Sequence, residues 1–170
     1  MNRSIAAIVA FALPALAFAA PAATAEIKNA AGETIGTAAF HSAPGGVELT
    51  IRVSKLSPGP HGFHIHAVGK CEGPEFKSAG GHFNPTGKHH GLENPAGPHA
   101  GDMPNLVAAA DGTASATVVL KSVTLEPGEA SLFHEGGTSV VIHAGPDDMK
   151  TDPAGNSGAR VACGVVERAR

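Results

Sequence analysis

Short runs in which apolar and polar residues alternate recur along most of the chain. An alternation of period two is typical of β-strands that bury one face. Glycine and proline separate these runs, which cover residues 33–40, 46–53, 106–120, 138–143 and 159–166. The dipeptide Asp111-Gly112 divides one run, and such a dipeptide between apolar stretches is a strong hairpin signal. The pattern predicts an all-β domain built as an antiparallel sandwich or barrel.

Two segments lack this alternation. Residues 69–105 are rich in glycine, histidine and proline, and residues 144–158 are polar and rich in turn-forming residues. A long loop inside a compact domain needs a function, or a tie such as a metal ion or a disulfide. Both segments follow closely on a histidine, His66 or His143, and this placement favours a metal site.

The first 25 residues have the features of a secretory leader. Arg3 precedes an apolar run over 5–20, and the small residues Ala23 and Ala25 stand at the positions that precede a cut. A transmembrane anchor is disfavoured because the run is short and contains proline. We therefore predict a signal peptide over 1–25 and one domain over 26–170, with cleavage after Ala19 as the alternative.

Charge and cysteine content narrow the classes of protein. The formal net charge of −3 is not basic enough to indicate a nucleic-acid-binding protein. Cys71 and Cys163 are the only cysteines in the chain, and in an exported protein such a pair predicts a disulfide. The mature chain is expected to carry no membrane anchor.

Histidines are spaced as metal ligands in two places. His64 and His66 share one face of a predicted strand, so that Phe63 and Ile65 face the core; a polar strand edge is the alternative. Together with His143 they form an imidazole-rich set of the kind that suits copper. A second set has three imidazoles and one carboxylate, which suits a closed, structural zinc site: His82, His90, His99 and Asp102. Loose metal binding by a histidine-rich loop is the alternative for the second set.

Six stretches of the chain resemble the copper/zinc superoxide dismutase family in order and spacing: GPHGFHIHAVGKC, GGHFNP, KHHG, PHAGD, SVVIHAGPDD and GARVACGVV. The resemblance covers nearly all of the predicted domain. It implies an eight-stranded antiparallel Greek-key β-barrel or sandwich, with two long loops that hold the metal and substrate sites outside the barrel.

The resemblance also implies the ligands of one copper and one zinc per subunit. Copper would be held by His64, His66, His82 and His143. Zinc would be held by His82, His90, His99 and Asp102. The imidazolate of His82 would therefore bridge the two metals. The family spacing favours His90 over His89 as a zinc ligand.

Further roles follow from the same resemblance. Arg160 corresponds to the arginine beside copper that docks the anionic substrate. Asp147 corresponds to the carboxylate that links a copper-ligand histidine to a zinc-ligand histidine. Cys71 and Cys163 correspond to the intrasubunit disulfide, and His61 to a structural histidine that is not a ligand.

The implied activity is the conversion of superoxide to oxygen and hydrogen peroxide, an antioxidant defence outside the cytoplasm. The loop from His143 to Arg160 is shorter than in the animal enzymes, and with the leader it resembles the bacterial exported branch, which implies a periplasmic location. The guiding residues of the animal enzymes therefore do not transfer, and Lys70, Lys77 and Lys150 are candidates for that role or merely solvated lysines. Homodimer formation is left open.

Two other classes of function are weighed against this one. A protein that binds copper or zinc without turnover would need the same ligands but not Arg160. A zinc hydrolase would need an open zinc position and a general base, which a set of three histidines and one aspartate does not offer.

Overall fold

The structure is a computed structural model that describes residues 22–169. The predicted leader falls mostly on residues 1–21, which lie outside the described residues. Ten strands and one short 3₁₀-helix are described: β1 (Ala23–Asn29), β2 (Thr34–Ala43), β3 (Gly46–Val53), β4 (Gly59–His61), β5 (Phe63–His66), η1 (Lys77–Ala79), β6 (Leu106–Ala108), β7 (Ala114–Leu120), β8 (Ser139–His143), β9 (Arg160–Val165) and β10 (Glu167–Arg168). No helix in the described part is long and apolar enough to cross a membrane.

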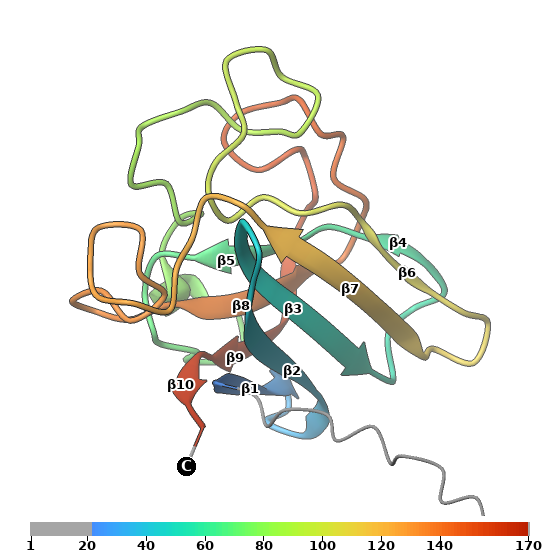
Figure 1. Ribbon diagram of the computed structural model, residues 1–170. Coiled ribbons are helices and arrows are strands. Elements are labelled where there is room, and N and C mark those ends of the chain that lie inside the picture. The colour runs from blue at the N-terminus through green and yellow to red at the C-terminus, as the bar shows by residue number, and fades with distance from the viewer. Residues whose placement is uncertain (1–21, 170) are drawn as a thin grey trace, which may run out of the picture.

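The strands form one antiparallel sheet that nearly closes on itself (Figure 1). The strand order is β4-β6-β7-β3-β2-β1-β9-β8-β5, and only Gly62 separates β4 from β5. Residues 59–66 therefore pair with β6 at one end of the order and with β8 at the other. β10 follows β9 after Val166 and pairs with β1. Counting β4 with β5 and β9 with β10 as single strands gives the predicted eight-stranded antiparallel barrel.

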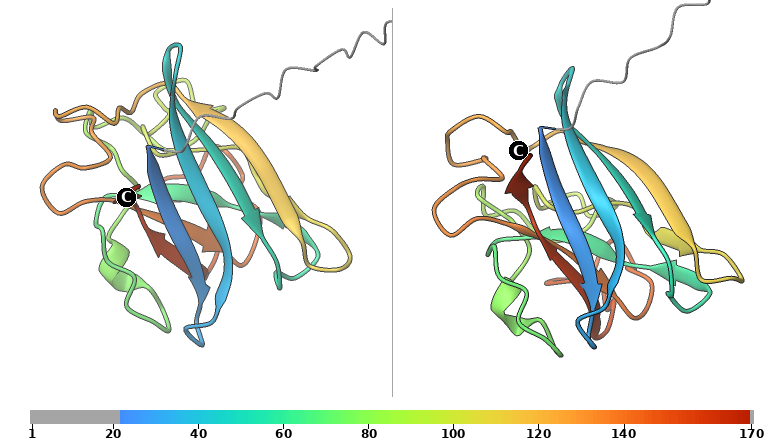
Figure 2. Two further views of the ribbon diagram at one scale, coloured as in Figure 1. Left: turned by 60° about the horizontal axis from the view of Figure 1, so that its bottom comes forward. Right: turned by 90° about the horizontal axis from the view of Figure 1, so that it is seen from below.

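Two connections join strands that are not neighbours in the sheet. β3 leads to β4 past β7 and β6, and β7 leads to β8 on the opposite side of the barrel. Connections of this kind among antiparallel strands are those of a Greek key. Figure 2 shows β1, β2, β3 and β7 side by side in one wall of the barrel.

The alternation in the sequence decides which side chains fill the barrel. In β3, Val47, Leu49 and Ile51 are buried, whereas the residues between them are partly exposed. In β5, Phe63 and Ile65 are fully buried in the same core, as the spacing of the two neighbouring histidines predicted. The hairpin predicted at Asp111-Gly112 is also confirmed, since it joins β6 to β7.

The alternating runs named from the sequence did not include the first strand. β1 starts at Ala23, three residues before residue 26, which was predicted as the first residue of the domain. The two predicted loops do lie where expected: β5 ends at His66 and β6 begins at Leu106, and β8 ends at His143 and β9 begins at Arg160. Figure 1 shows both loops on the same side of the barrel, beyond β5 and β8.

The predicted disulfide between Cys71 and Cys163 is present. It ties the first long loop to β9, and the two Cα atoms are 5.6 Å apart. Cys163 is buried and packs with Phe76, Ala79 and Val141. The disulfide therefore holds the segment with Phe76 and Ala79 against β8 and β9 of the barrel wall.

We expect Cys71→Ser to lower the free energy of unfolding by about 4–5 kcal/mol, because the lost cross-link spans a sequence separation of 92 residues. Denaturant unfolding of the two proteins measures this difference. A reducing agent should destabilise the wild type and leave the variant unchanged. If the unfolding midpoint of the wild type is the same with and without the reducing agent, the prediction is wrong.

Candidate metal centre

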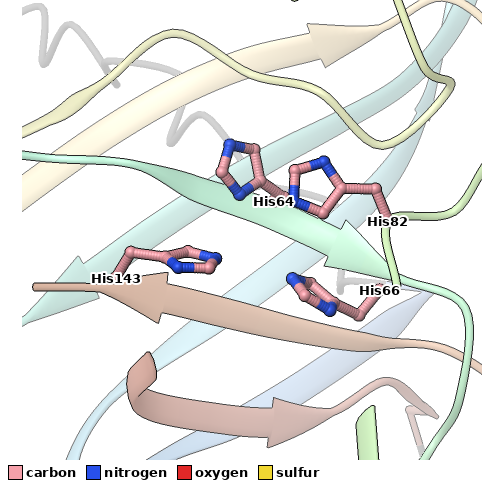
Figure 3. Close-up of side chains that lie close together, drawn as sticks. All are labelled: His64, His66, His82 and His143. Atoms are coloured by element: carbon pink, nitrogen blue, oxygen red, sulfur yellow. The ribbon is translucent and has the colours of Figure 1, made fainter. Parts of the chain in front are cut away.

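Four imidazoles from three parts of the chain converge beside the barrel (Figure 3). His64 and His66 lie on β5, His143 ends β8, and His82 comes from the first long loop. Each offers one ring nitrogen, and these four nitrogens all lie within 4.8 Å of one another. The side chains are almost completely buried, so the cluster is shielded from bulk water.

The outer nitrogens of these rings are bound by the protein. His66 Nδ1 donates to the Gly80 carbonyl at 2.9 Å, and His143 Nδ1 donates to the Gly158 carbonyl at 3.1 Å. His64 Nε2 donates to Asp147 Oδ2 at 2.6 Å. Each of these hydrogen bonds fixes one ring orientation and aims the other nitrogen toward the centre.

The inner nitrogens have no hydrogen-bond partner. They are His64 Nδ1, His66 Nε2, His82 Nε2 and His143 Nε2, and all four are buried. A buried polar atom without a partner is costly, and native proteins seldom leave four together. Four converging imidazole nitrogens are a donor set that fits copper.

Burial also keeps three of these rings neutral. It lowers the pKa of His64 to about 3, that of His66 to about 2 and that of His143 to about 4. A neutral imidazole has a free lone pair, whereas a protonated one cannot bind a metal. The lone pairs are therefore available at neutral pH without competition from protons.

A second cluster surrounds Asp102. Its Oδ1 atom lies 2.9 Å from His82 Nδ1, 3.0 Å from His90 Nδ1 and 3.4 Å from His99 Nδ1. These four residues form a second group whose donor atoms lie within 4.8 Å of one another. Three imidazoles and a carboxylate are a donor set that fits a tetrahedral zinc ion. The ring of His82 thus faces one cluster with Nε2 and the other with Nδ1.

The charge around His90 favours a cation at the second cluster. Burial lowers the pKa of His90, but hydrogen bonds to Asp102 and Asp147 outweigh it and raise the pKa to about 9. Burial would raise the pKa values of both carboxyl groups, yet their histidine partners hold these values below the usual range. Two anionic carboxylates next to buried imidazoles therefore provide negative charge for a metal ion.

Main-chain contacts bring the histidines and the aspartate of the first long loop close to the histidines of the strands. Ile65 N–H donates to the Gly101 carbonyl at 2.9 Å, and Phe83 N–H donates to the Ile65 carbonyl at 2.8 Å. A Cβ atom on Gly101 would lie 2.3 Å from the Ile65 carbonyl oxygen, so only glycine allows this approach. Asp102, the next residue, is thereby placed opposite His64.

Asp102 and Asp147 are themselves held in place. The Oδ2 atom of Asp102 accepts hydrogen bonds from the backbone N–H groups of Gly91 and His99, at 2.8 and 2.9 Å. Asp147 bridges the two clusters, since its Oδ2 accepts from His64 and its Oδ1 from His90 Nε2 at 3.0 Å. His64, His90 and Asp147 also form a third group of nearby donors, which this hydrogen bonding already pairs.

Two further histidines belong to neither cluster. His61 uses both ring nitrogens, to the carbonyls of His143 at 2.7 Å and Ser57 at 2.8 Å. His89 pairs with Asp152, whose other oxygen accepts the His90 N–H at 2.5 Å. Asp152 thus joins the second loop to the first, a contact for which the sequence offers no signal.

Arg160 lies at the start of β9, and its guanidinium is fixed by two backbone carbonyls. Nη1 donates to Phe76 at 2.7 Å and Nη2 donates to Gly80 at 2.6 Å. The Gly80 carbonyl therefore orients both Arg160 and the ring of His66. Arg160 also lines a surface hollow of about 480 Å³ together with Glu75 and Lys77. Burial lowers the pKa of Arg160, yet an arginine remains charged at neutral pH.

We expect the metal-free protein to lose stability as the pH falls from 7 toward 4. An unfolded histidine has a pKa near 6.5, whereas His64, His66 and His143 have folded pKa values of about 3, 2 and 4. Below pH 6.5 the unfolded chain therefore binds more protons, and each such group lowers the free energy of unfolding by at most about 1.4 kcal/mol per pH unit.

His90 has the opposite effect on the pH dependence of stability, because its pKa in the folded protein is raised to about 9. Its contribution is fully present below pH 6.5 and is lost as the pH rises through 9. Denaturant unfolding of the metal-free protein at several pH values from 4 to 9 measures both effects. Unchanged stability between pH 7 and pH 4 would contradict the first.

Comparisons with known proteins agree with this geometry. The family model described as copper/zinc superoxide dismutase (SODC) matches residues 34–166. Superoxide dismutase [Cu-Zn] 1 of Aquifex aeolicus is 54% identical over 145 residues, which are 84% of this chain and 86% of the relative. Superoxide dismutase [Cu-Zn] of Caulobacter vibrioides is 45% identical over 148 residues, with 85% of each chain covered.

Solved structures give the same result for the fold. The crystal structure of a SOD-like protein from Bacillus subtilis superposes with a TM-score of 0.81 at 39% identity, covering 84% of this chain and 96% of that one. Cu/Zn superoxide dismutase from Brucella abortus gives a TM-score of 0.68 at 34% identity, covering 85% of this chain and 98% of that one.

Proposed function

We propose, since this chain belongs to the copper/zinc superoxide dismutase family, that it converts superoxide to oxygen and hydrogen peroxide at the two clusters described above. The copper ligands in this proposal are His64, His66, His82 and His143. The zinc ligands are His82, His90, His99 and Asp102. The observation that carries the proposal is the set of four inward-facing, unpartnered imidazole nitrogens beside a closed set that shares His82.

Each metal supplies one kind of chemistry when bound. Copper can take up and return one electron, which the reaction requires, whereas zinc has a single oxidation state and serves as a fixed positive charge. The residues of the chain would hold both metals, and His82 would belong to both ligand sets. Oxidation of one superoxide to oxygen balances reduction of another to peroxide, which takes up two protons.

His82 is the residue placed to handle one of these protons. Its Nδ1 atom faces the Asp102 cluster and is fixed there, while Nε2 faces the other three imidazoles. When His82 Nε2 is not bound to a metal, it can hold a proton and pass it to the reduced substrate. Water supplies the second proton. The ring does not need to leave its place, because Nδ1 holds it throughout.

Arg160 binds and orients the anionic substrate in this proposal. Its guanidinium cannot lose its charge at neutral pH, and the two carbonyl contacts hold it in one orientation. Lys77 lines the same hollow and adds positive charge, partly balanced by its ion pair with Glu75 at 2.6 Å. Lys150 pairs with Glu93 instead and does not line this hollow, which favours Lys77 as the guiding lysine.

We expect Arg160→Glu to slow dismutation by roughly 10- to 100-fold and Arg160→Lys to slow it less, because a field at the site attracts the anion. The wild-type rate should fall as salt is added. Lys77→Glu should have a smaller, salt-sensitive effect, and Lys150→Glu is the matched control without effect. Rates at several ionic strengths, with copper and zinc content measured, provide the test. A rate indifferent to the charge of residue 160 would remove Arg160 from the mechanism.

The location proposed for the protein is the bacterial periplasm, outside the cytoplasm. The leader features of residues 1–25 and the disulfide between Cys71 and Cys163 support export, because disulfides persist in oxidising compartments. The mature chain is proposed to have no membrane anchor and no nucleic-acid partner. The sequence leaves homodimer formation open, and sedimentation at several protein concentrations would decide it.

The proposal as a whole is tested by measuring metal content and dismutation rate on the same purified sample. We expect one copper and one zinc per chain and a rate that scales with copper content. Full copper loading without turnover would instead support the alternative class, a metal-binding protein that does not react with superoxide.

A further inference from the structure

The first strand extends into the segment that resembles a leader. Ala23 and Ala25 are 0% and 1% exposed and belong to the main hydrophobic core. Thr24 and Glu26 between and beyond them are exposed, so the strand alternation is already regular at Ala23. These alanines are therefore part of the barrel wall.

Main-chain hydrogen bonds on both sides of β1 also place residues 22–25 in the barrel wall. Ala22 N–H donates to the Phe40 carbonyl at 2.8 Å, and Ala169 N–H donates to the Ala22 carbonyl at 3.1 Å. Ala23 lies opposite Phe40 of β2 and opposite Arg168 of β10. Residues 22–25 are thus held between two neighbouring segments.

A cut after Ala25 would remove this part of the barrel. β10 pairs with β1 through Ala23 and Thr24, so it would lose its partner residues in that strand. A cut after Ala22 would remove the residue whose N–H and carbonyl pair with Phe40 and Ala169, and it would place the new chain terminus at the first residue of β1.

We propose that the leader is removed by hydrolysis of the Ala19–Ala20 peptide bond, so that the mature chain begins at Ala20. Ala17 and Ala19 are small residues at the third and first positions before this bond, as a signal peptidase requires. Water cleaves the bond and leaves a carboxylate on Ala19 and an ammonium group on Ala20. The new terminus then precedes Ala22 and leaves β1 complete. This inference rests on the export proposed above.

The full chain, produced in a Gram-negative bacterium and purified from the periplasm, tests the site by N-terminal sequencing and intact mass. We expect a chain that begins at Ala20. A chain that begins at Ala23 or Glu26 would overturn this inference and leave the dismutase proposal intact. A chain found uncut and only in the cytoplasmic fraction would overturn both this inference and export, again without touching the metal assignment.

Two variants make the test specific. Ala19→Leu should slow or redirect the cut, because it places a large residue directly before the bond. Phe18→Leu is the matched control and should be processed as the wild type, since the position between the two small residues is unrestricted. Normal processing of Ala19→Leu would overturn the assignment.

The contribution of residues 22–25 to the stability of the barrel can be measured separately. We expect the metal-loaded chain that begins at Glu26 to melt roughly 5–10 °C below the chain that begins at Ala20, because it lacks the buried alanines and the pairing to β2 and β10. Equal melting temperatures would overturn the inference, since residues 22–25 would then contribute nothing to the fold.

Discussion

Replacing His143 with alanine is expected to abolish dismutation at every pH. Its Nε2 atom is one of the four buried nitrogens that face one another without a partner, and its Nδ1 atom is fixed by the Gly158 carbonyl. The loss should be more than about 100-fold, because replacing even an outer partner of a metal ligand typically costs 10- to 100-fold. His143 ends β8, across from the strand that carries His64 and His66, so no other described imidazole can take its place.

The measurement compares turnover and copper content of the variant with those of the wild type. His41→Ala is the matched control, because His41 is a partly exposed residue of β2 that belongs to neither cluster. We expect the control to keep both copper and rate. If the His143 variant turns over at the wild-type rate, the copper assignment is wrong.

Most of the barrel could be predicted because its strands show their burial in the sequence. The runs that became β2, β3 and β7 alternate in burial, and Asp111-Gly112 marks the turn between β6 and β7, whereas all five residues of β8 are buried. β1 was missed although it alternates in the same way. Its buried residues, Ala23 and Ala25, are small, and small residues two apart also satisfy the rule for a leader cleavage site. Only the pairing with β2 and β10 distinguishes the two readings.

The residues around the two clusters also fall into those that the sequence could indicate and those that it could not. Histidine and aspartate carry their donor chemistry in the side chain, so spacing and a family resemblance could indicate them. The group that orients both His66 and Arg160 is the backbone carbonyl of Gly80. A carbonyl is present at every residue, so its role follows from the path of the loop alone. The carboxylate of Asp152 was missed because it acts through one backbone N–H and the non-ligand His89.

Replacing Asp102 with asparagine is expected to remove zinc and leave the copper ligands in place. Asp102 belongs to one cluster only, and its Oδ1 atom is the acceptor that the three imidazoles share. Asparagine can still accept the N–H groups of Gly91 and His99 with its amide oxygen, so the loop should keep its path. Its NH₂ group then faces the imidazoles and cannot bind a cation. Asp102→Ala would lose zinc as well and would also leave those two N–H groups without their partner.

The variant should dismute superoxide normally near neutral pH and fall behind the wild type as the pH rises. His64, His66, His82 and His143 keep their inward-facing nitrogens, so the redox centre remains. The ring of His82 loses what holds it at Nδ1, because both zinc and the Asp102 carboxylate at 2.9 Å are gone. With the ring no longer held, His82 Nε2 depends on solvent to supply its proton and to bring it back into line with the other three imidazoles. Protons become scarce at high pH, so this step should slow as the pH rises. The wild type, with Nδ1 held, should show the flatter profile.

A pH–rate profile of the wild type and both Asp102 variants, each with copper and zinc determined, decides the matter. The two variants should share the same pH dependence, while Asp102→Ala should also be less stable because two buried N–H groups have lost their acceptor. Full zinc content in Asp102→Asn would contradict the zinc assignment. Zinc loss with a flat profile would instead show that His82 needs no support at Nδ1, and the shared-histidine mechanism would then be wrong.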